Sequence, residues 1–146
     1  MRNFRKGTEE DILQIAELEA STFSDAWSAT SVQGTLKQKQ AFITVAEVDG
    51  KVVGYCIIYY AMDEAEIARI AISDTARRQG IGRALLDYSC EVCKHEHVGK
   101  LLLDVRESNA GAIAFYEQYG FRTDGIRKNF YDFPRENAVL MSYTLA

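Results

Sequence analysis

Residues 66–106 contain a strand-like segment, a loop with glycines, an amphipathic helical segment and a second strand-like segment, in that order. The first apolar run covers residues 66–72, and the second, residues 100–106, reads Lys-Leu-Leu-Leu-Asp-Val-Arg. Two strands that are joined through a helix pair in parallel, with a right-handed crossover. This unit therefore predicts a parallel strand pair with a helix packed against the sheet.

The loop between the first strand and the helix reads Arg77-Arg78-Gln79-Gly80-Ile81-Gly82. Glycine lets the backbone adopt positive φ, and the first turn of a helix directs unpaired N–H groups and a positive dipole end at an anion. The two arginines supply counter-charge. The spacing predicts a phosphate site, with an ordinary tight turn as the alternative. It matches neither the nucleotide P-loop nor the dinucleotide fingerprint.

The remaining segments alternate between the two periodicities. Asp49-Gly50, between two β-rich runs, is a strong signal for a hairpin. Thr8 and either Ser108 or Asn109 are placed to begin helices, and Gly120 fits a helix end. We expect strands at residues 3–5, 41–48, 51–61, 66–72, 100–106, 121–127 and 138–145, and helices after Thr8, at 28–37, at 80–96 and after Asn109.

Size and charge limit the class of protein. A chain of 146 residues is the usual size of one domain, so we expect a single domain over residues 1–146. No apolar run reaches the ~20 residues that cross a bilayer, and the N-terminus lacks an apolar signal segment, so we expect a cytoplasmic protein. A net charge of −4 argues against a general nucleic-acid binder.

Cys90 and Cys93, followed by His95 and His97, have a spacing that can bind zinc. The helical register argues against this interpretation, because both cysteines fall on an apolar stripe with Leu86. We therefore expect reduced thiols that pack as small buried hydrophobes, and no metal.

Four segments, which occur in the same order as in a known family, carry a resemblance to that family. They are Ile70-Ala71-Ile72, the run from Arg77 to Leu86, Asp104-Val105-Arg106-Glu107-Ser108-Asn109, and Ala114-Phe115-Tyr116-Glu117-Gln118-Tyr119-Gly120-Phe121. Together they resemble the GNAT family of N-acetyltransferases over nearly the whole chain. The resemblance implies an α/β (α+β) fold. Its mixed, mostly antiparallel sheet of about seven strands has a central parallel pair and helices on both faces.

The resemblance also implies an activity, which is transfer of acetyl from acetyl-CoA to the N-terminal α-amine of a protein. Trp27-Ser28 and the run from Arg127 to Tyr131 are similar to the branch that acetylates the N-terminal alanine of ribosomal small-subunit protein eighteen. Three alternatives stay open: a different acceptor (a small amine, an antibiotic or a lysine side chain), a CoA-binding module without activity, and a nucleotide- or RNA-binding protein.

The family pattern assigns roles to individual residues. Asp104 stands where the branch has a glutamate base, Glu66 is the rival base, and Tyr116 corresponds to the tyrosine that protonates the departing CoA thiolate. The pattern, with the phosphate loop, gives these cofactor-binding residues: Ile70, Ala71, Ile72, Arg77, Arg78, Gln79, Gly80, Ile81, Gly82, Arg83, Asn109 and Tyr116.

The acceptor residues come from the less specific part of the resemblance. Trp27 is expected to form an apolar wall, and Tyr131, in the loop between the last two strands, to hydrogen-bond the acceptor backbone. Nucleic acid and membrane are not expected as partners. A further expectation is an acidic cleft for a basic peptide, formed by Asp25, Asp63, Glu64 and Glu136.

Overall fold

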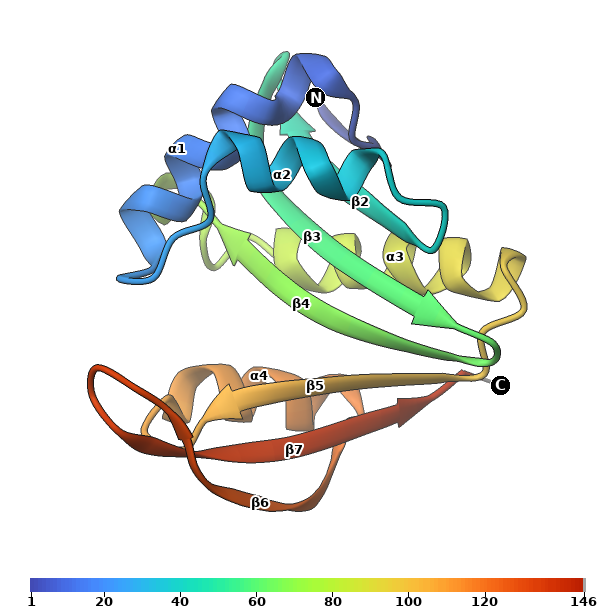
Figure 1. Ribbon diagram of the computed structural model, residues 1–146. Coiled ribbons are helices and arrows are strands. Elements are labelled where there is room, and N and C mark those ends of the chain that lie inside the picture. Colours follow the sequence, from blue (N-terminus) through green and yellow to red (C-terminus); the bar gives the residue numbers. More distant parts are fainter. Residues whose placement is uncertain (146) are drawn as a thin grey trace.

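The computed structural model describes residues 1–145, which form one seven-stranded sheet with four α-helices (Figure 1). The strand order is β1-β2-β3-β4-β5-β7-β6. Of the neighbouring pairs only β4 and β5 are parallel, which confirms the expected mixed sheet. The elements are β1 (Arg2–Lys6), α1 (Ile12–Thr22), α2 (Ala29–Leu36), β2 (Ala41–Val48), β3 (Lys51–Ala61), β4 (Glu64–Ile72), α3 (Ile81–His95), β5 (Lys100–Arg106), α4 (Ala110–Tyr119), β6 (Arg122–Tyr131) and β7 (Glu136–Thr144).

The helices lie on both faces of the sheet, as expected (Figure 1). α1 and α2 cover one face, where Ile12, Ile15 and Val32 pack on residues of β2 and β3. α3 and α4 cover the other face and contribute Leu85 and Tyr116 to a second, larger apolar cluster. The sheet thus separates two cores, because alternate side chains of each strand point to opposite faces.

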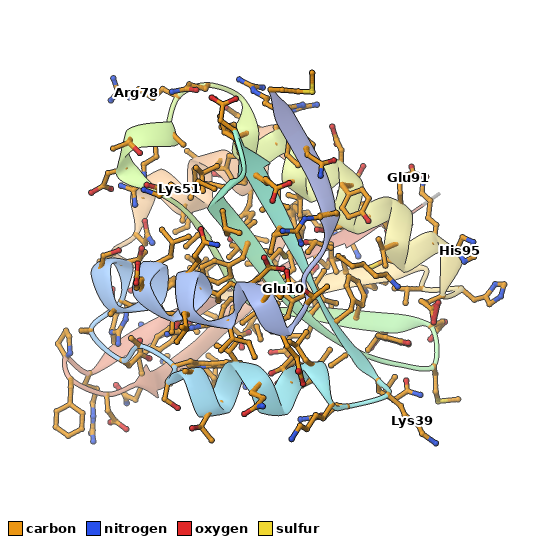
Figure 2. The ribbon with its side chains drawn as sticks, turned by 90° about the horizontal axis from the view of Figure 1, so that it is seen from above. Glu10, Lys39, Lys51, Arg78, Glu91 and His95 are labelled. Carbon is orange, nitrogen blue, oxygen red and sulfur yellow. The ribbon has the colours of Figure 1, made fainter. Side chains whose placement is uncertain are left out.

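Two local predictions are confirmed. At the turn between β2 and β3, Asp49 and Gly50 both have positive φ, 51° and 82°, which matches the right-handed twist of a two-residue hairpin. In α3, Cys90 and Cys93 are buried in the larger cluster, whereas His95 lies at the surface (Figure 2). Burial raises the pKa of both thiols, so they stay protonated at neutral pH.

The parallel pair is short. Only Glu64–Glu66 of β4 pair with Lys100–Leu102 of β5. Beyond this point β4 continues along β3 as far as Ile72, and β5 continues along β7 as far as Arg106. The two strands therefore diverge at the middle of the sheet, and their facing edges lose the ladder that pairs the rest of the strands.

β4 carries a bulge at Ala68, because Ile57 of β3 pairs with Arg69 and Ile58 pairs with Ile67. A bulge places two successive residues on one face and reverses the alternation after it. Ala68 accordingly packs with the α1 and α2 cluster, and Ile70 and Ile72 pack against the α3 cluster.

The structure corrects several expected boundaries. β6 extends to Tyr131, which pairs with Glu136, so Tyr131 ends a strand and does not lie in the loop. The strand was hard to follow in sequence because the register is irregular between Arg127 and Tyr131, with Asn129 at a φ of 54°. β4 begins at Glu64, and a 3-10 turn, Glu9–Asp11, precedes α1. Each helix within residues 1–145 is too short or too polar to cross a membrane.

Candidate active site

The site is centred on the point where β4 and β5 separate. The predicted cofactor residues Ile70, Ala71 and Ile72 lie on the part of β4 that β5 no longer accompanies. An edge without a neighbouring strand offers main-chain donors and acceptors to an extended ligand. The carbonyl of Ile72 already accepts a hydrogen bond from Arg77 Nε at 3.1 Å.

The N-terminus of α3 is open to an anion. Gly80 precedes the helix with a φ of 75°, and its lack of a side chain leaves the first-turn N–H groups of Ile81 to Arg83 without a side-chain cap. Of the other helices, α2 is capped by Ser28 and α4 by Asn109, whereas α1 has no side-chain cap but directly continues the 3-10 turn Glu9–Asp11. The uncapped end of α3 is therefore the suitable place for a phosphate.

The polar side chains of this loop differ in what they contact. Arg77 is bound to Asp74 at 2.8 Å, and Arg83 lies over the Tyr119 ring at 5.3 Å. Gln79 donates to the Thr75 carbonyl at 3.3 Å. Arg78, with a φ of 63°, lies at the rim of the molecule (Figure 2), and no ion pair involves it among residues 1–145. Arg78 is thus the guanidinium most available to an anion.

Asn109 has a structural task besides the predicted one. Its Oδ1 accepts a hydrogen bond from Ala112 N at 3.1 Å and caps α4. Only the NH2 group of its amide is left for a ligand, so Asn109 can donate to a cofactor but its oxygen is already used.

Tyr116 lies in α4 with its ring buried, 7 % exposed, edge-on to Phe115 and Phe121 at 5.4 Å each. No residue of the described chain hydrogen-bonds its hydroxyl, although every fully buried side-chain N or O atom there has a partner. The hydroxyl must therefore reach a solvent-accessible surface. Burial raises the pKa of the phenol, so it holds its proton at neutral pH.

Glu66 and Asp104 lie on the opposite face of the sheet from α4. Glu66 is paired with Leu102, and Asp104 follows Leu102 by two residues, so all three side chains point to the same face. The pKa of Glu66 is raised by partial burial and by the negative charge of Asp104, while Arg127 opposes the shift. The structure thus brings the two rival bases together as a pair of interacting carboxyl groups.

Arg106 holds Tyr131 at the C-terminal end of β5, which also carries Asp104. The guanidinium lies 4.4 Å from the Tyr131 ring centre and 3.1 Å from Glu136 Oε1. Burial and the charge of Asp104 raise the pKa of Tyr131 to about 12. Tyr131 therefore stays a hydrogen-bond donor beside Asp104.

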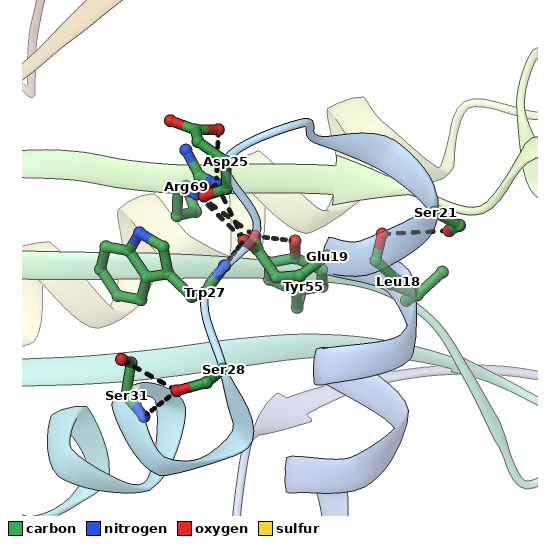
Figure 3. A network of polar contacts seen from close by, with 9 residues as sticks. All are labelled: Leu18, Glu19, Ser21, Asp25, Trp27, Ser28, Ser31, Tyr55 and Arg69. Carbon is green, nitrogen blue, oxygen red and sulfur yellow. Dashed lines mark hydrogen bonds and ion pairs between the residues drawn. The ribbon is translucent and has the colours of Figure 1, made fainter.

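Trp27 lies half-buried in the connection between α1 and α2, and its backbone N–H donates to Glu19 at 2.9 Å (Figure 3). Sequence reasoning missed Glu19, which is fully buried, and Arg69, which binds it at 2.9 Å. A signal was present, since Glu19 interrupts the apolar helical stripe of Ile12 and Ile15.

The expected acidic cleft is wrong, because the structure separates its members. Glu64 pairs with Lys100 at the start of β5, whereas Glu136 binds Arg106 at the end of the same strand. Asp63 lies in the turn beside Glu64, and Asp25 is paired with Arg69 at 3.2 Å. Asp25 and Glu136 both lie near Tyr131 but are paired with Arg69 and Arg106, whereas Asp63 and Glu64 lie at the other end of β5, so the four residues form no single surface.

The candidate catalytic residues lie on both faces of the sheet, around the point where β4 and β5 diverge. A pair of carboxyl groups and Tyr131 lie on one face, and a protonated phenol lies on the other, next to an open strand edge and an open helix N-terminus. Such an arrangement can accept a proton from an attacking nucleophile and give one to a leaving group.

Comparisons with known proteins identify the same class of fold and chemistry. A model of the acetyltransferase (GNAT) family matches residues 12–121. A Bacillus subtilis relative is 38 % identical over 146 residues, which cover 99 % of this chain and 95 % of that protein. The ribosomal protein bS18-alanine N-acetyltransferase of Escherichia coli is 39 % identical over 100 residues, 67 % of this chain and 68 % of that protein. The crystal structure of the Escherichia coli ribosomal-protein-S18-alanine N-acetyltransferase superposes with a TM-score of 0.91 at 30 % identity, over 100 % of this chain and 95 % of that one.

Proposed function

This chain belongs to the acetyltransferase (GNAT) family, and we propose that it transfers the acetyl group of acetyl-CoA to the N-terminal alanine of ribosomal protein bS18, the reaction of RimI enzymes. The observation that carries the acceptor is the similarity to the bS18-alanine N-acetyltransferase of Escherichia coli in both sequence and structure. We assign the reaction to a single domain, residues 1–146, acting in the cytoplasm.

The described residues fit acetyl-CoA as the acetyl donor. The free edge of β4 at Ile70 to Ile72 suits the extended, amide-containing arm of CoA, and the uncapped N–H groups of α3 suit its pyrophosphate. Arg78 adds positive charge at that end, and the Asn109 amide can donate to the arm.

The acceptor amine must lose a proton before it attacks the thioester carbonyl. An α-amino group, with a pKa of about 7.7 to 8.0, is roughly one-third neutral at pH 7.5, whereas a lysine near 10.4 is about 0.1 % neutral. A modest base suffices, and we assign that task to Asp104 and Glu66 acting as a coupled pair.

The second proton transfer completes the reaction. As the C–S bond breaks, the sulfur becomes a thiolate, and the Tyr116 hydroxyl is the protonated group on that side of the strands. A thiolate with an ordinary pKa near 8.5 is already a fair leaving group, so we expect this acid to supply a limited part of the rate enhancement. Trp27 and Tyr131 then flank the acceptor chain.

Mass spectrometry of small-subunit ribosomal proteins, incubated with acetyl-CoA and the enzyme, tests the proposal. We expect a gain of one acetyl group on the N-terminal alanine of bS18 and on a synthetic peptide of the same first residues. The matched control is that peptide with its α-amine blocked and its lysines free. Acetylation of the blocked peptide at equal rates, or an unmodified alanine when CoA is released with other amines, would refute the assignment of the acceptor.

A further inference from the structure

The connection between α1 and α2, residues 23–28, is neither a helix nor a strand. Its only hydrogen bonds between backbone groups within the described chain are at its two ends, from Phe23 N to Glu19 O and from Val32 N to Ser28 O. Such a segment is mobile unless side chains hold it. The conformation of Trp27 must therefore be set by groups from elsewhere in the fold.

Glu19 supplies the first of these groups. It projects from α1 into the core with an exposed fraction of 0 %. A buried carboxylate is very unfavourable unless it is paired and hydrogen-bonded. Its partners are the Tyr55 hydroxyl, the Arg69 guanidinium and the backbone N–H of Trp27, the last at 2.9 Å (Figure 3).

Arg69 supplies the second group, and the bulge in β4 is what directs it. Because Ala68 is the extra residue, Arg69 turns to the α1 face. There its guanidinium lies 4.1 Å from the Phe23 ring centre and 5.6 Å from that of Trp27, and it donates to the Asp25 carbonyl at 3.0 Å. One guanidinium thus contacts three residues of the six-residue connection.

We propose that Arg69, anchored by Glu19, is a positioning residue that fixes the connection at residues 23–28 and so sets the affinity for the acceptor chain. This inference rests on the proposed function, because it takes Trp27 as part of the acceptor site. The guanidinium does not itself contact the reacting atoms. It holds Trp27 beside the acceptor-side face of β4, where Glu66 precedes Arg69 by three residues.

Lysine cannot replace arginine in this role. Its ammonium group has neither the planar face that stacks on Phe23 and Trp27 nor the fork that binds Glu19 through two nitrogens. Arg69→Lys keeps the charge that Glu19 needs, so we expect a folded protein with a loosened connection.

Steady-state kinetics with an alanine-terminal peptide test the proposal. For Arg69→Lys we expect the acceptor KM to rise about tenfold, equivalent to ~1.4 kcal/mol, with kcat and the KM for acetyl-CoA nearly unchanged. The matched control is Arg5→Lys, because Arg5 also joins two carboxylates, Asp11 at 2.8 Å and Glu47 at 3.0 Å, but lies on β1, three strands from β4. Equal effects of the two variants on the acceptor KM would overturn the proposal.

Trp27 provides a second readout that does not depend on the acceptor, since it is the only tryptophan in the chain. Arg69→Lys should move its emission to longer wavelength and increase its quenching by acrylamide, and Arg5→Lys should change neither. Unchanged fluorescence in a folded Arg69→Lys protein would refute the positioning role even if bS18 is not the acceptor. If Arg69→Lys does not fold, Asp25→Ala replaces it. That variant removes one exposed contact of Arg69, and we expect a smaller change in the same direction, whereas no change would refute the role.

Discussion

Substitution of two tyrosines of α4 tests the chemistry of the site separately from the stability of the fold. Tyr116 and Tyr119 are one helical turn apart, and both rings pack against Phe121. The Tyr119 hydroxyl donates to Asp87 at 2.7 Å, whereas the Tyr116 hydroxyl has no partner in the described chain. Replacing each by phenylalanine removes one oxygen and leaves the packing of the ring.

The expected effects are opposite. Tyr116→Phe deletes no hydrogen bond, so the free energy of unfolding should change by less than about 0.5 kcal/mol. The rate of CoA release should fall by roughly 10- to 100-fold, at or below the lower end of the usual ~10²- to 10⁴-fold effect of general acid catalysis, because the thiolate leaves readily without help. Tyr119→Phe should cost about 1 kcal/mol of stability through the lost hydrogen bond and leave the rate unchanged.

The assay follows the CoA thiol with a chromogenic disulfide, using an alanine-terminal peptide as acceptor. The enzyme contributes little background because Cys56, Cys90 and Cys93 are all buried. Urea unfolding of both variants gives the stabilities. A Tyr116→Phe enzyme that releases CoA at the wild-type rate would refute the role of the phenol, and so would a loss of stability equal to that of Tyr119→Phe.

Three further predictions concern charge and backbone. Asp104→Asn removes the negative charge that helps to raise the pKa of Glu66, so the acid limb of kcat/KM for the residual activity should move to lower pH; a limb at the wild-type position would contradict the coupling. Gly80→Ala has room for its Cβ but must keep a φ of 75°, which costs roughly 1 to 2 kcal/mol. Urea unfolding should show this cost, and acetyl-CoA should raise the Tm by less than in the wild type. Asp11 has a lowered pKa because Arg5 donates to it, so its contribution to stability is complete above about pH 4 and is lost as the pH falls through the lower folded-state value. Arg5→Lys should weaken this dependence in acid titrations followed by circular dichroism, whereas an identical acid transition would exclude the ion pair as its cause.

Much of the architecture could be predicted from local sequence, because a helix or hairpin is encoded by residues that are close along the chain. The bounds of β2, β3 and β5 agree with the expected residues, and Asp49-Gly50 forms the expected turn. The stripe through Leu86, Cys90 and Cys93 indicated which side of α3 is buried. By contrast, β6 was predicted four residues too short at its end, since its register is irregular before Tyr131.

The spacing of two isoleucines in β4 is a local sequence signal for the bulge at Ala68. Ile67 and Ile70 are three residues apart, so a strand that buries both on one face must contain an extra residue between them. The direction of the Arg69 side chain, which follows from the bulge, could not be predicted from local sequence, because its partner Glu19 lies 50 residues away. Only the packing of α1 on β3 and β4 brings that carboxylate to the guanidinium.

The sequence by itself determined the order of the elements, the uncapped start of α3 and the residue types available for chemistry, since each depends on neighbouring positions. The tertiary structure decided where β4 and β5 separate. It also decided that Glu66 and Asp104 lie on the same face of the sheet as Tyr131, and that Tyr116 lies on the opposite face. The physical reason is that strand pairing beyond Glu66 is a competition among segments far apart in the chain. β4 stays paired with β3 and β5 stays paired with β7, so β4 and β5 diverge from each other.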